Sequence, residues 1–164
     1  MERIWAPWRL AFVEGNEEKP AGCIFCLFPA ERRDRERLVL GRSEHAFAIL
    51  NKYPYNNGHL MVVPRRHAAD PAALDEAEWS DLQRLLRTSI AILKEAYGPD
   101  ALNVGMNLGR AAGAGIADHL HWHAVPRWSG DTNFMPVLAE TRVIPEHLDA
   151  TWQKLRPLFD RALS

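Results

Sequence analysis

The sequence predicts a single α+β domain in which a mostly antiparallel sheet packs against two helices. Three observations predict this class. Short runs of β-forming residues follow one another along the chain, an amphipathic stripe covers residues 75–97, and apolar residues recur at helical spacing over 146–162. A chain of 164 residues with 47% hydrophobic content can build one hydrophobic core.

Five segments have the composition of β-strands. They span residues 37–41, 45–50, 59–64, 101–108 and 119–126. The turn-forming segment from Tyr53 to Gly58 precedes the third run, and the glycine-rich segment 109–115 leads into the fifth. The short connections between the first three runs favour neighbouring antiparallel strands.

Two segments have helical periodicity. In the first, apolar residues recur every three or four positions, at Trp79, Leu82, Leu85, Leu86, Ile90, Leu93 and Tyr97. Gly98 and Pro99 are expected to end this helix. In the second, the apolar positions are Leu148, Trp152, Leu155 and Phe159, and Pro157 is expected to bend the helix or end it early.

The whole chain, residues 1–164, is expected to form one domain. It would comprise an N-terminal arm and loop (1–22), a core (23–145) and a C-terminal helix (146–164). Charged residues make up 25% of the chain but the net charge is only -1, so no positive field would hold nucleic acid or an anionic membrane. Neither a signal peptide nor a membrane span is recognisable. We therefore expect a cytoplasmic protein with a local binding site.

Three histidines alternate with apolar residues in the run that begins at His119. His121 and His123 follow at steps of two, so in a strand the three imidazoles would share one face, roughly 7 Å apart. Such a row can grip an anion, bind a metal or supply a nucleophile whose pKa lies near neutral pH. The alternative is a surface strand with incidental histidines.

The segment from His119 to Val125 matches the pattern His-φ-His-φ-His-φ-φ, where φ is apolar, and so resembles the histidine triad superfamily of nucleotide hydrolases and transferases. The resemblance extends to residues 50–64, to 126–134 and to the Arg3–Arg9 arm. It is strongest to bacterial diadenosine tetraphosphate phosphorylases and the fragile histidine triad branch. It implies a five-stranded antiparallel sheet with a helix over 76–97 and another at the C-terminus, a homodimer, and an adenine nucleotide substrate.

The resemblance also implies catalytic roles for two histidines. His121 would attack the α-phosphorus of a dinucleoside polyphosphate and become nucleotidylated, with its other ring nitrogen donating to the carbonyl of His119. His123 would contact phosphate or bridging oxygens. The acceptor that releases the nucleotide would be water or phosphate.

Further positions would bind the substrate. Asn51 resembles a position near the ribose, and Asn107 resembles one near the phosphates. Many relatives carry Gly-Gln-Ser or Gly-Gly-Ser just before the triad, whereas this chain has Ala114, Gly115 and Ile116. Backbone N–H groups of Ala114 and Gly115 could still cradle phosphate, and the alternative is a plain connector.

The two cysteines, Cys23 and Cys26, are separated by two residues, which in a reducing cytosol favours metal binding or redox chemistry. By resemblance to zinc-bearing relatives, His67 and His119 would complete a closed, structural Zn²⁺ site. A reducible cysteine pair and two merely buried thiols are the alternatives. Three other histidines, His45, His59 and His147, are interpreted as packing or surface residues.

Three other functions fit parts of this pattern. The triad histidines themselves could hold a catalytic zinc that activates water, although three successive ligands along one strand cannot converge on one ion. A nucleotide-binding sensor or adaptor with weak turnover would account for the missing loop hydroxyl. The third alternative is a nucleoside phosphoramidate or adenylate hydrolase, which would use the same nucleophile.

Overall fold

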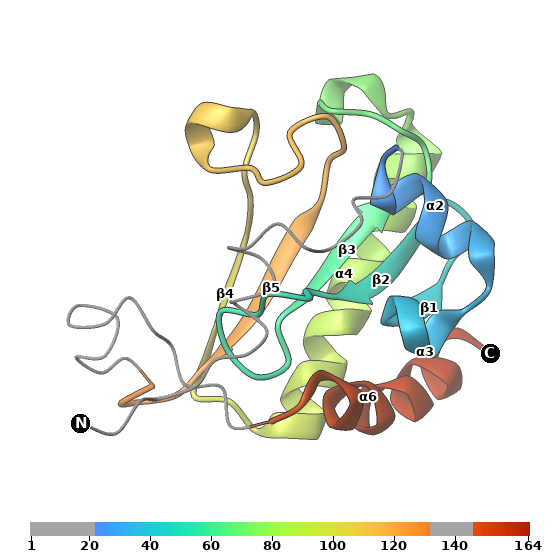
Figure 1. Cartoon of the computed structure of the whole chain (residues 1–164). Helices are drawn as coiled ribbons and strands as arrows, with labels where there is room; N and C mark the ends of the chain where they lie inside the picture. Colours follow the sequence, from blue (N-terminus) through green and yellow to red (C-terminus); the bar gives the residue numbers. More distant parts are fainter. Residues whose placement is uncertain (1–21, 132–145) are drawn as a thin grey trace.

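The computed structural model describes residues 22–131 and 146–164 (Figure 1). The predicted arm, apart from Gly22, and the 132–145 part of the predicted core lie outside the described residues. Helices and strands follow in the order α2 (Ile24–Glu31), α3 (Asp34–Arg37), β1 (Val39–Arg42), β2 (Ala46–Leu50), β3 (Leu60–Pro64), η1 (Pro71–Ala73), α4 (Glu76–Tyr97), β4 (Ala101–Met106), η2 (Arg110–Ala112), β5 (Trp122–Arg127) and α6 (Leu148–Leu163).

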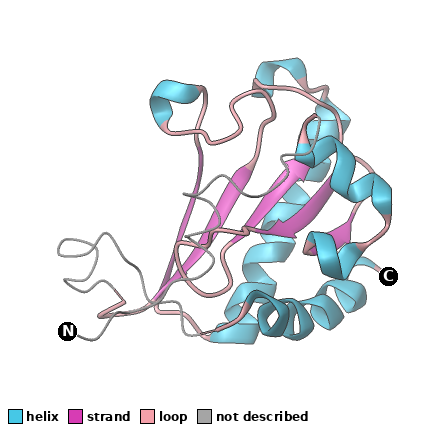
Figure 2. Cartoon of the chain, in the orientation of Figure 1, coloured by secondary structure: helices cyan, strands magenta, loops and turns pink. Residues whose placement is uncertain are grey.

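One five-stranded sheet forms the centre of the fold, in the order β1-β2-β3-β5-β4 (Figure 2). Every neighbouring pair is antiparallel. The sequence prediction of a five-stranded antiparallel sheet is therefore confirmed. The short helices α2 and α3 were not predicted, because α2 contains Pro29 and α3 is a single turn.

The two faces of the sheet carry different layers. On one face α4 and α6 pack against the strands, and residues such as Leu82, Leu93, Leu155 and Phe159 form the larger hydrophobic core. On the other face α2 contributes Phe25 to a smaller core with Phe47, Ile49, Met61 and Val63. Met61 pairs with His123 of β5, so the His123 side chain lies on this second face as well.

Local sequence explains the bounds of α4. Asp75 caps its N-terminus by accepting the Glu78 N–H, and the Glu78 side chain accepts the Asp75 N–H, which together form a capping box. Gly98 ends the helix in the left-handed conformation, at φ 52°. The predicted helix and its stop at Gly98 are confirmed.

The prediction that Pro157 would bend or end the C-terminal helix early was wrong, because α6 continues through it to Leu163. Proline removes the hydrogen bond to the carbonyl four residues earlier, here that of the exposed residue Gln153, which water can reach. Leu155 and Phe159 are fully buried, so packing of the apolar face outweighs this loss.

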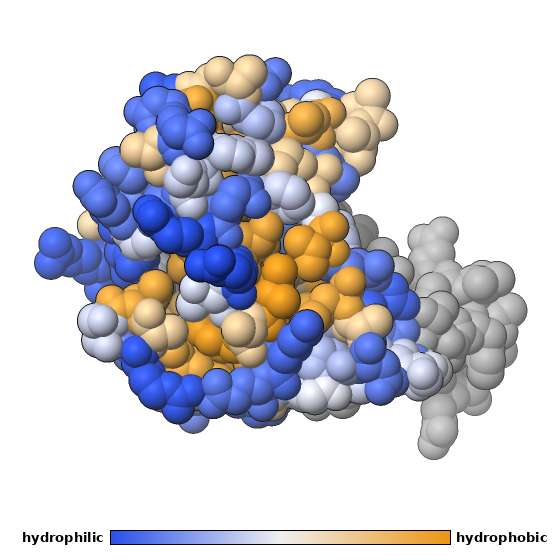
Figure 3. Space-filling view, turned by 180° about the vertical axis from the view of Figure 1, so that it is seen from behind, coloured by the Kyte–Doolittle hydropathy of each residue, from blue (hydrophilic) through white to orange (hydrophobic). Residues whose placement is uncertain are grey.

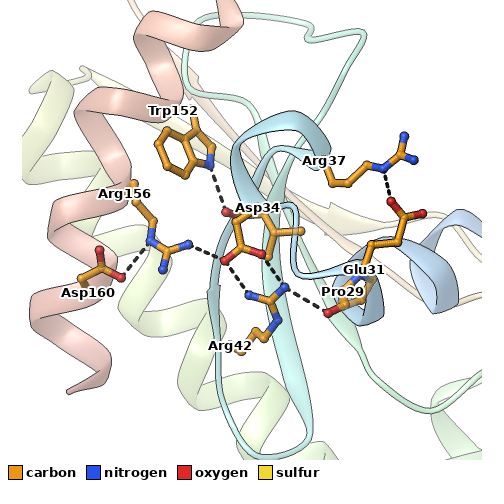
Figure 4. A network of polar contacts seen from close by, with 9 residues as sticks. Pro29, Glu31, Asp34, Arg37, Arg42, Trp152, Arg156 and Asp160 are labelled. Atoms are coloured by element: carbon orange, nitrogen blue, oxygen red, sulfur yellow. Dashed lines mark hydrogen bonds and ion pairs between the residues drawn. The ribbon is translucent and has the colours of Figure 1, made fainter.

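A network of charged groups fixes α6 beside α3 and β1 (Figure 4). Asp34 accepts hydrogen bonds from Arg42 of β1 and from Arg156 of α6, at 2.6 and 2.7 Å. The indole N–H of Trp152 donates to the carbonyl of Val39. The Arg42 guanidinium, and then that of Arg156, hold the pKa of Asp34 below its usual range against the opposing effect of burial.

The fifth strand begins later than predicted. It starts at Trp122, so His119 and His121 precede it. The backbone N–H of Leu120 donates to the carbonyl of Ala68, which lies beyond the end of β3, instead of joining a strand ladder. None of the helices in the described ranges combines the length and apolar composition that a membrane crossing requires.

Candidate active site and metal cluster

The ring of His121 is held by the backbone just before β5. Its Nδ1 lies 2.8 Å from the carbonyl oxygen of His119, and since a carbonyl can only accept, this nitrogen carries the ring proton. The lone pair of the neutral ring is therefore on Nε2. His121 is only 5% exposed, and its ring lies 5.1 Å from that of Phe25.

The proton positions of the neighbouring histidines follow in the same way. The backbone N–H of Tyr55 donates to Nδ1 of His59 at 3.0 Å, which leaves the proton of neutral His59 on Nε2. That nitrogen lies 3.0 Å from Nδ1 of His123 and donates to it. His123 therefore carries its own proton on Nε2. The amide nitrogen of Asn51, 3.4 Å from the same Nε2 of His59, is in packing contact.

The environment keeps these rings neutral. Burial, followed by the charges of His123 and His121, lowers the pKa of His59 to about 3. Burial, followed by the charge of His121, lowers the pKa of His123 to about 4. Burial also lowers the pKa of His121, against the opposing effect of its hydrogen bond to His119. At neutral pH the site thus presents one imidazole lone pair, on His121, beside one imidazole N–H donor, on His123.

The spacing of the rings differs from the expectation. The ring centres of His121 and His123 are 4.9 Å apart and the planes lie at 73°, whereas the strand rule predicted about 7 Å. The rule does not apply because His121 precedes the strand, so its backbone is free of the ladder geometry. The closer approach brings the lone pair and the donor to one place.

His59, interpreted as a packing or surface residue, is a packed residue that also contacts the triad, which the sequence analysis missed. It is 1% exposed and hydrogen-bonded to a triad histidine. A signal was available in the register: Met61 pairs with His123, and His59, two residues from Met61, lies on the same face of the sheet. Without the register, the sequence alone could not show this contact.

The predicted substrate residues lie after β2, after β4 and in the glycine-rich loop. Asn51 accepts the N–H of Tyr53 with its side-chain oxygen. Asn107 directly follows β4. In the glycine-rich loop, the N–H of Ala114 donates to the carbonyl of Gly109 at 3.4 Å, while Gly115 is exposed, with no atom within 4 Å of where a Cβ would stand. Ile116 packs on the small core that contains Phe25, which places the loop on the triad face.

The four predicted metal ligands come together in a second cluster. Ligand atoms of Cys23, Cys26, His67 and His119 all lie within 4.8 Å of one another, and this cluster could hold a metal ion. His119 donates from Nε2 to the carbonyl of Pro64 at 2.8 Å, so the lone pair of its Nδ1 faces the thiols. Burial, then the Cys23 thiol, raises the pKa of the Cys26 thiol.

The distances within the cluster test whether a tetrahedral ion fits. From usual zinc bond lengths, S–N edges of about 3.5 Å and N–N edges of about 3.3 Å are expected. Nδ1 of His119 lies 3.3 Å from Sγ of Cys23 and 3.6 Å from Sγ of Cys26. Nδ1 of His67 lies 3.4 Å from Sγ of Cys26 and 3.2 Å from Nδ1 of His119. The residues present therefore fit a zinc ion.

Comparison with known proteins shows that the chain belongs to the HIT domain family. That family matches residues 32–130. The AP-4-A phosphorylase of Mycobacterium tuberculosis is 37% identical over an aligned length of 158 residues, and the match covers 92% of this chain and 80% of that protein. An adenosine 5'-monophosphoramidase of Schizosaccharomyces pombe is 31% identical over 105 residues, 64% of this chain and 74% of that protein.

A solved structure shares the fold as well. It is that of a hypothetical histidine triad nucleotide-binding protein from Sulfolobus tokodaii, with a TM-score of 0.69 and 28% identity. The match covers 85% of this chain and 93% of that one. The family membership inferred from the three histidines is therefore confirmed.

Proposed function

We propose that this protein cleaves dinucleoside polyphosphates, in particular diadenosine tetraphosphate or triphosphate, through a nucleotide bound covalently to His121. The observation that carries the proposal is the hydrogen bond from Nδ1 of His121 to the carbonyl of His119, which leaves Nε2 unprotonated as a nucleophile. The 37% identity to an AP-4-A phosphorylase supports the substrate class.

The reaction has two displacements. In the first, the Nε2 lone pair of His121 bonds to the α-phosphorus of diadenosine tetraphosphate, and the bond to the bridging oxygen breaks with its electron pair leaving on ATP. His121 keeps its Nδ1 proton, so the AMP adduct is a cationic imidazolium that the His119 carbonyl stabilises. In the second, an oxygen of water or phosphate attacks the same phosphorus and the electron pair of the P–N bond returns to Nε2. Water releases a proton to solvent and gives AMP, and phosphate gives ADP.

His123 acts as a hydrogen-bond donor in this mechanism. Its neutral Nε2–H would donate to the bridging oxygen as negative charge develops there. ATP is stable as an anion, so the donor need not give up its proton, which an imidazole with only one ring proton holds strongly. Among the substrate residues, Asn51 would bind the ribose, Asn107 the phosphates, and the backbone N–H of Gly115 the phosphate chain. The N–H of Ala114 would join it on leaving the carbonyl of Gly109.

Two other functions use the same pocket. Similarity to the monophosphoramidase of S. pombe favours a nucleoside phosphoramidate or adenylate as substrate. The loop at Ala114 and Gly115 lacks a side-chain hydroxyl, which favours a nucleotide sensor with weak turnover. The products and the single-turnover rate distinguish these functions from the proposed one.

We propose that the cluster of Cys23, Cys26, His67 and His119 holds a structural Zn²⁺. With four protein ligands the ion would have no open position for water, so it would tie α2 to the segment before β5 and support His119. Zinc-binding thiolates require reduced cysteines, which supports a cytoplasmic location.

We also propose that the protein is a homodimer built on the edge of the sheet at β4. Leu102, Val104 and Met106 pair with Pro126, Ala124 and Trp122 of β5 and so lie on the face of the sheet that α4 covers. Val104 is nevertheless 40% exposed. Figure 3 shows hydrophobic residues gathered on this rear face of the molecule. Within the described ranges, β5 is the one strand that pairs with β4, and an edge strand with an apolar face is suited to bind a second copy.

A quench experiment tests the proposed reaction. Wild-type protein is mixed with diadenosine tetraphosphate radiolabelled at its α-phosphates, with and without inorganic phosphate, and quenched within one turnover. We expect label on the peptide that contains His121, and ADP plus ATP when phosphate is the acceptor. His121→Asn should lose turnover by at least about 10³-fold while retaining nucleotide binding, whereas the same change at the exposed His147 should have no effect.

Three results would overturn the proposal. They are turnover by His121→Asn at the wild-type rate, wild-type turnover without any label on His121, and tight nucleotide binding with no turnover at all. The last result would instead favour a sensor.

A further inference from the structure

Tyr55 lies beside the triad, in the loop that leads into β3. Its ring centre is 4.6 Å from that of His59 and 6.1 Å from that of His123. The ring planes of Tyr55 and His123 are nearly parallel, at 24°. The residue is 50% exposed. One side chain thus contacts both members of the histidine pair, while half of its surface faces outward.

The main chain of the same residue acts on the same pair. The N–H of Tyr55 donates to Nδ1 of His59, and this bond places the proton of His59 on Nε2, from which it reaches Nδ1 of His123. If His59 carried its proton on Nδ1, the Tyr55 N–H would face another donor. The chain of bonds therefore begins at Tyr55 and ends at the N–H that His123 presents to substrate.

The ring of Tyr55 holds a second property of His123, the orientation of its ring plane. Histidine rotates easily about its terminal bond, and a half turn would exchange Nδ1 with a carbon and break the bond from His59. His121 meets His123 edge-on at 73°, and Tyr55 stacks on it. Contacts with two differently oriented rings hold the plane more firmly than the hydrogen bond alone.

We propose that Tyr55 is a positioning residue for His123, its ring holding the imidazole plane and its main-chain N–H fixing, through His59, the proton on Nε2. This inference rests on the proposed function for its catalytic meaning. It assigns to the loop 51–59 a role in catalysis besides ribose binding by Asn51.

Among the residues that the structure describes, the titratable groups that face His123 are Tyr55, His59, ahead of β3, and His121, ahead of β5. Strand β4 presents Gly105 opposite it. Removing the Tyr55 ring would admit water to His59 and His123, and the pKa of His123 would rise from about 4 toward the ordinary value for histidine. The imidazole of His123 would also become free to adopt the tautomer protonated on Nδ1.

Three substitutions separate the effects of the ring. Tyr55→Ala removes both the aromatic ring and its apolar volume. Tyr55→Leu keeps an apolar side chain without a ring, and Tyr55→Phe keeps the ring. Long-range ¹H–¹⁵N spectra of the ligand-free protein report the tautomer and the pKa of His123, and steady-state kinetics with diadenosine tetraphosphate report kcat and KM.

For Tyr55→Ala we expect a second His123 tautomer, a His123 pKa higher by about one unit, and a kcat lower by roughly tenfold with KM nearly unchanged. Tyr55→Leu should restore the pKa but not kcat, and Tyr55→Phe should restore both. An unchanged tautomer and pKa in Tyr55→Ala would overturn the proposal, as would full kcat in Tyr55→Leu.

If Tyr55→Ala fails to fold, the Leu and Phe variants decide by the same criteria. The spectra need no substrate, so they test the positioning of His123 even if no dinucleotide is cleaved. Failure to label wild-type His121 would refute the proposed reaction without changing the spectral result.

Discussion

His59 donates its Nε2 proton to Nδ1 of His123 across 3.0 Å, and this bond joins the residue before β3 to the triad strand. His59 is buried, His123 is partly buried, and both rings are neutral at neutral pH. A protonated His59 would still have a donor at Nε2 but would place a second donor against the Tyr55 N–H. The pair therefore makes the stability of the fold depend on pH. It also fixes the nitrogen from which His123 donates a hydrogen bond to substrate.

The free energy of unfolding should fall as pH drops below about 6.5, where a histidine in the unfolded chain takes up a proton. Folded His59, with a pKa lowered to about 3 by burial, does not. Its contribution is thus fully present above about pH 6.5 and is lost progressively down to about pH 3, by up to about 1.4 kcal/mol per pH unit. Urea unfolding between about pH 7 and 5 measures this slope.

His59→Gln should reduce that slope by up to about 1.4 kcal/mol per pH unit, and the remaining slope comes from His121 and His123, whose pKa values are also lowered by burial. The matched control is His147→Gln, at an exposed position before α6, which should keep the wild-type slope. A slope in His59→Gln equal to that of the wild type would show that other groups carry the pH dependence.

Removal of the metal should destabilise the fold without abolishing nucleotidylation. Chelation should lower Tm by roughly 10 °C or more, because a four-ligand zinc site contributes directly to folding. Metal content by mass spectrometry, Tm by calorimetry and label on His121 are measured together. Cys26→Ala should have the same low Tm, with no further decrease on chelation. Complete loss of chemistry in chelated protein that remains folded would instead favour a catalytic metal.

A charge on the exposed face of β4 should separate the proposed dimer. Val104→Asp would place a carboxylate in an apolar interface without a partner, and we expect the dimer dissociation constant to rise by at least about tenfold in sedimentation experiments. The fold should persist, since Val104 is already 40% exposed. Leu27→Asp, which changes a 37% exposed residue on α2, should leave the association unchanged. A monomeric wild type would refute the dimer outright.

Restoring a hydroxyl in the loop should broaden the range of leaving groups. A Cβ at Gly115 meets no atom within 4 Å, so Gly115→Ser should fold with a stability within about 0.5 kcal/mol of the wild type. We expect roughly tenfold faster cleavage of adenosine 5'-monophosphoramidate, whose amine leaves poorly without a donor, and a smaller effect on diadenosine tetraphosphate. Gly115→Ala should have neither effect. Equal rates for the Ser and Ala variants would show that the backbone alone serves the leaving group.

Patterns that depend on local chemistry were readable in the sequence. The helical stripe to Tyr97 and its stop at Gly98 follow from periodicity and from the left-handed conformation that glycine accepts. The three histidines at steps of two identified the family, which the match over residues 32–130 confirms. The continuation of α6 through Pro157 was missed because burial of Phe159 is a tertiary effect that local propensity cannot reveal.

By itself, the sequence determined the five strands, the two longer helices and the family, since these depend on residue type and spacing along the chain. The resemblance to that family added His67 and His119 to the two cysteines as metal ligands. The resemblance had predicted the hydrogen bond from His121 to the carbonyl of His119. Only the tertiary structure decided which nitrogen of His59, His119 and His123 carries a proton, because the deciding groups are the carbonyl of Pro64 and the N–H of Tyr55. A neutral imidazole has two tautomers of similar energy, and only a fixed donor or acceptor in space can select one.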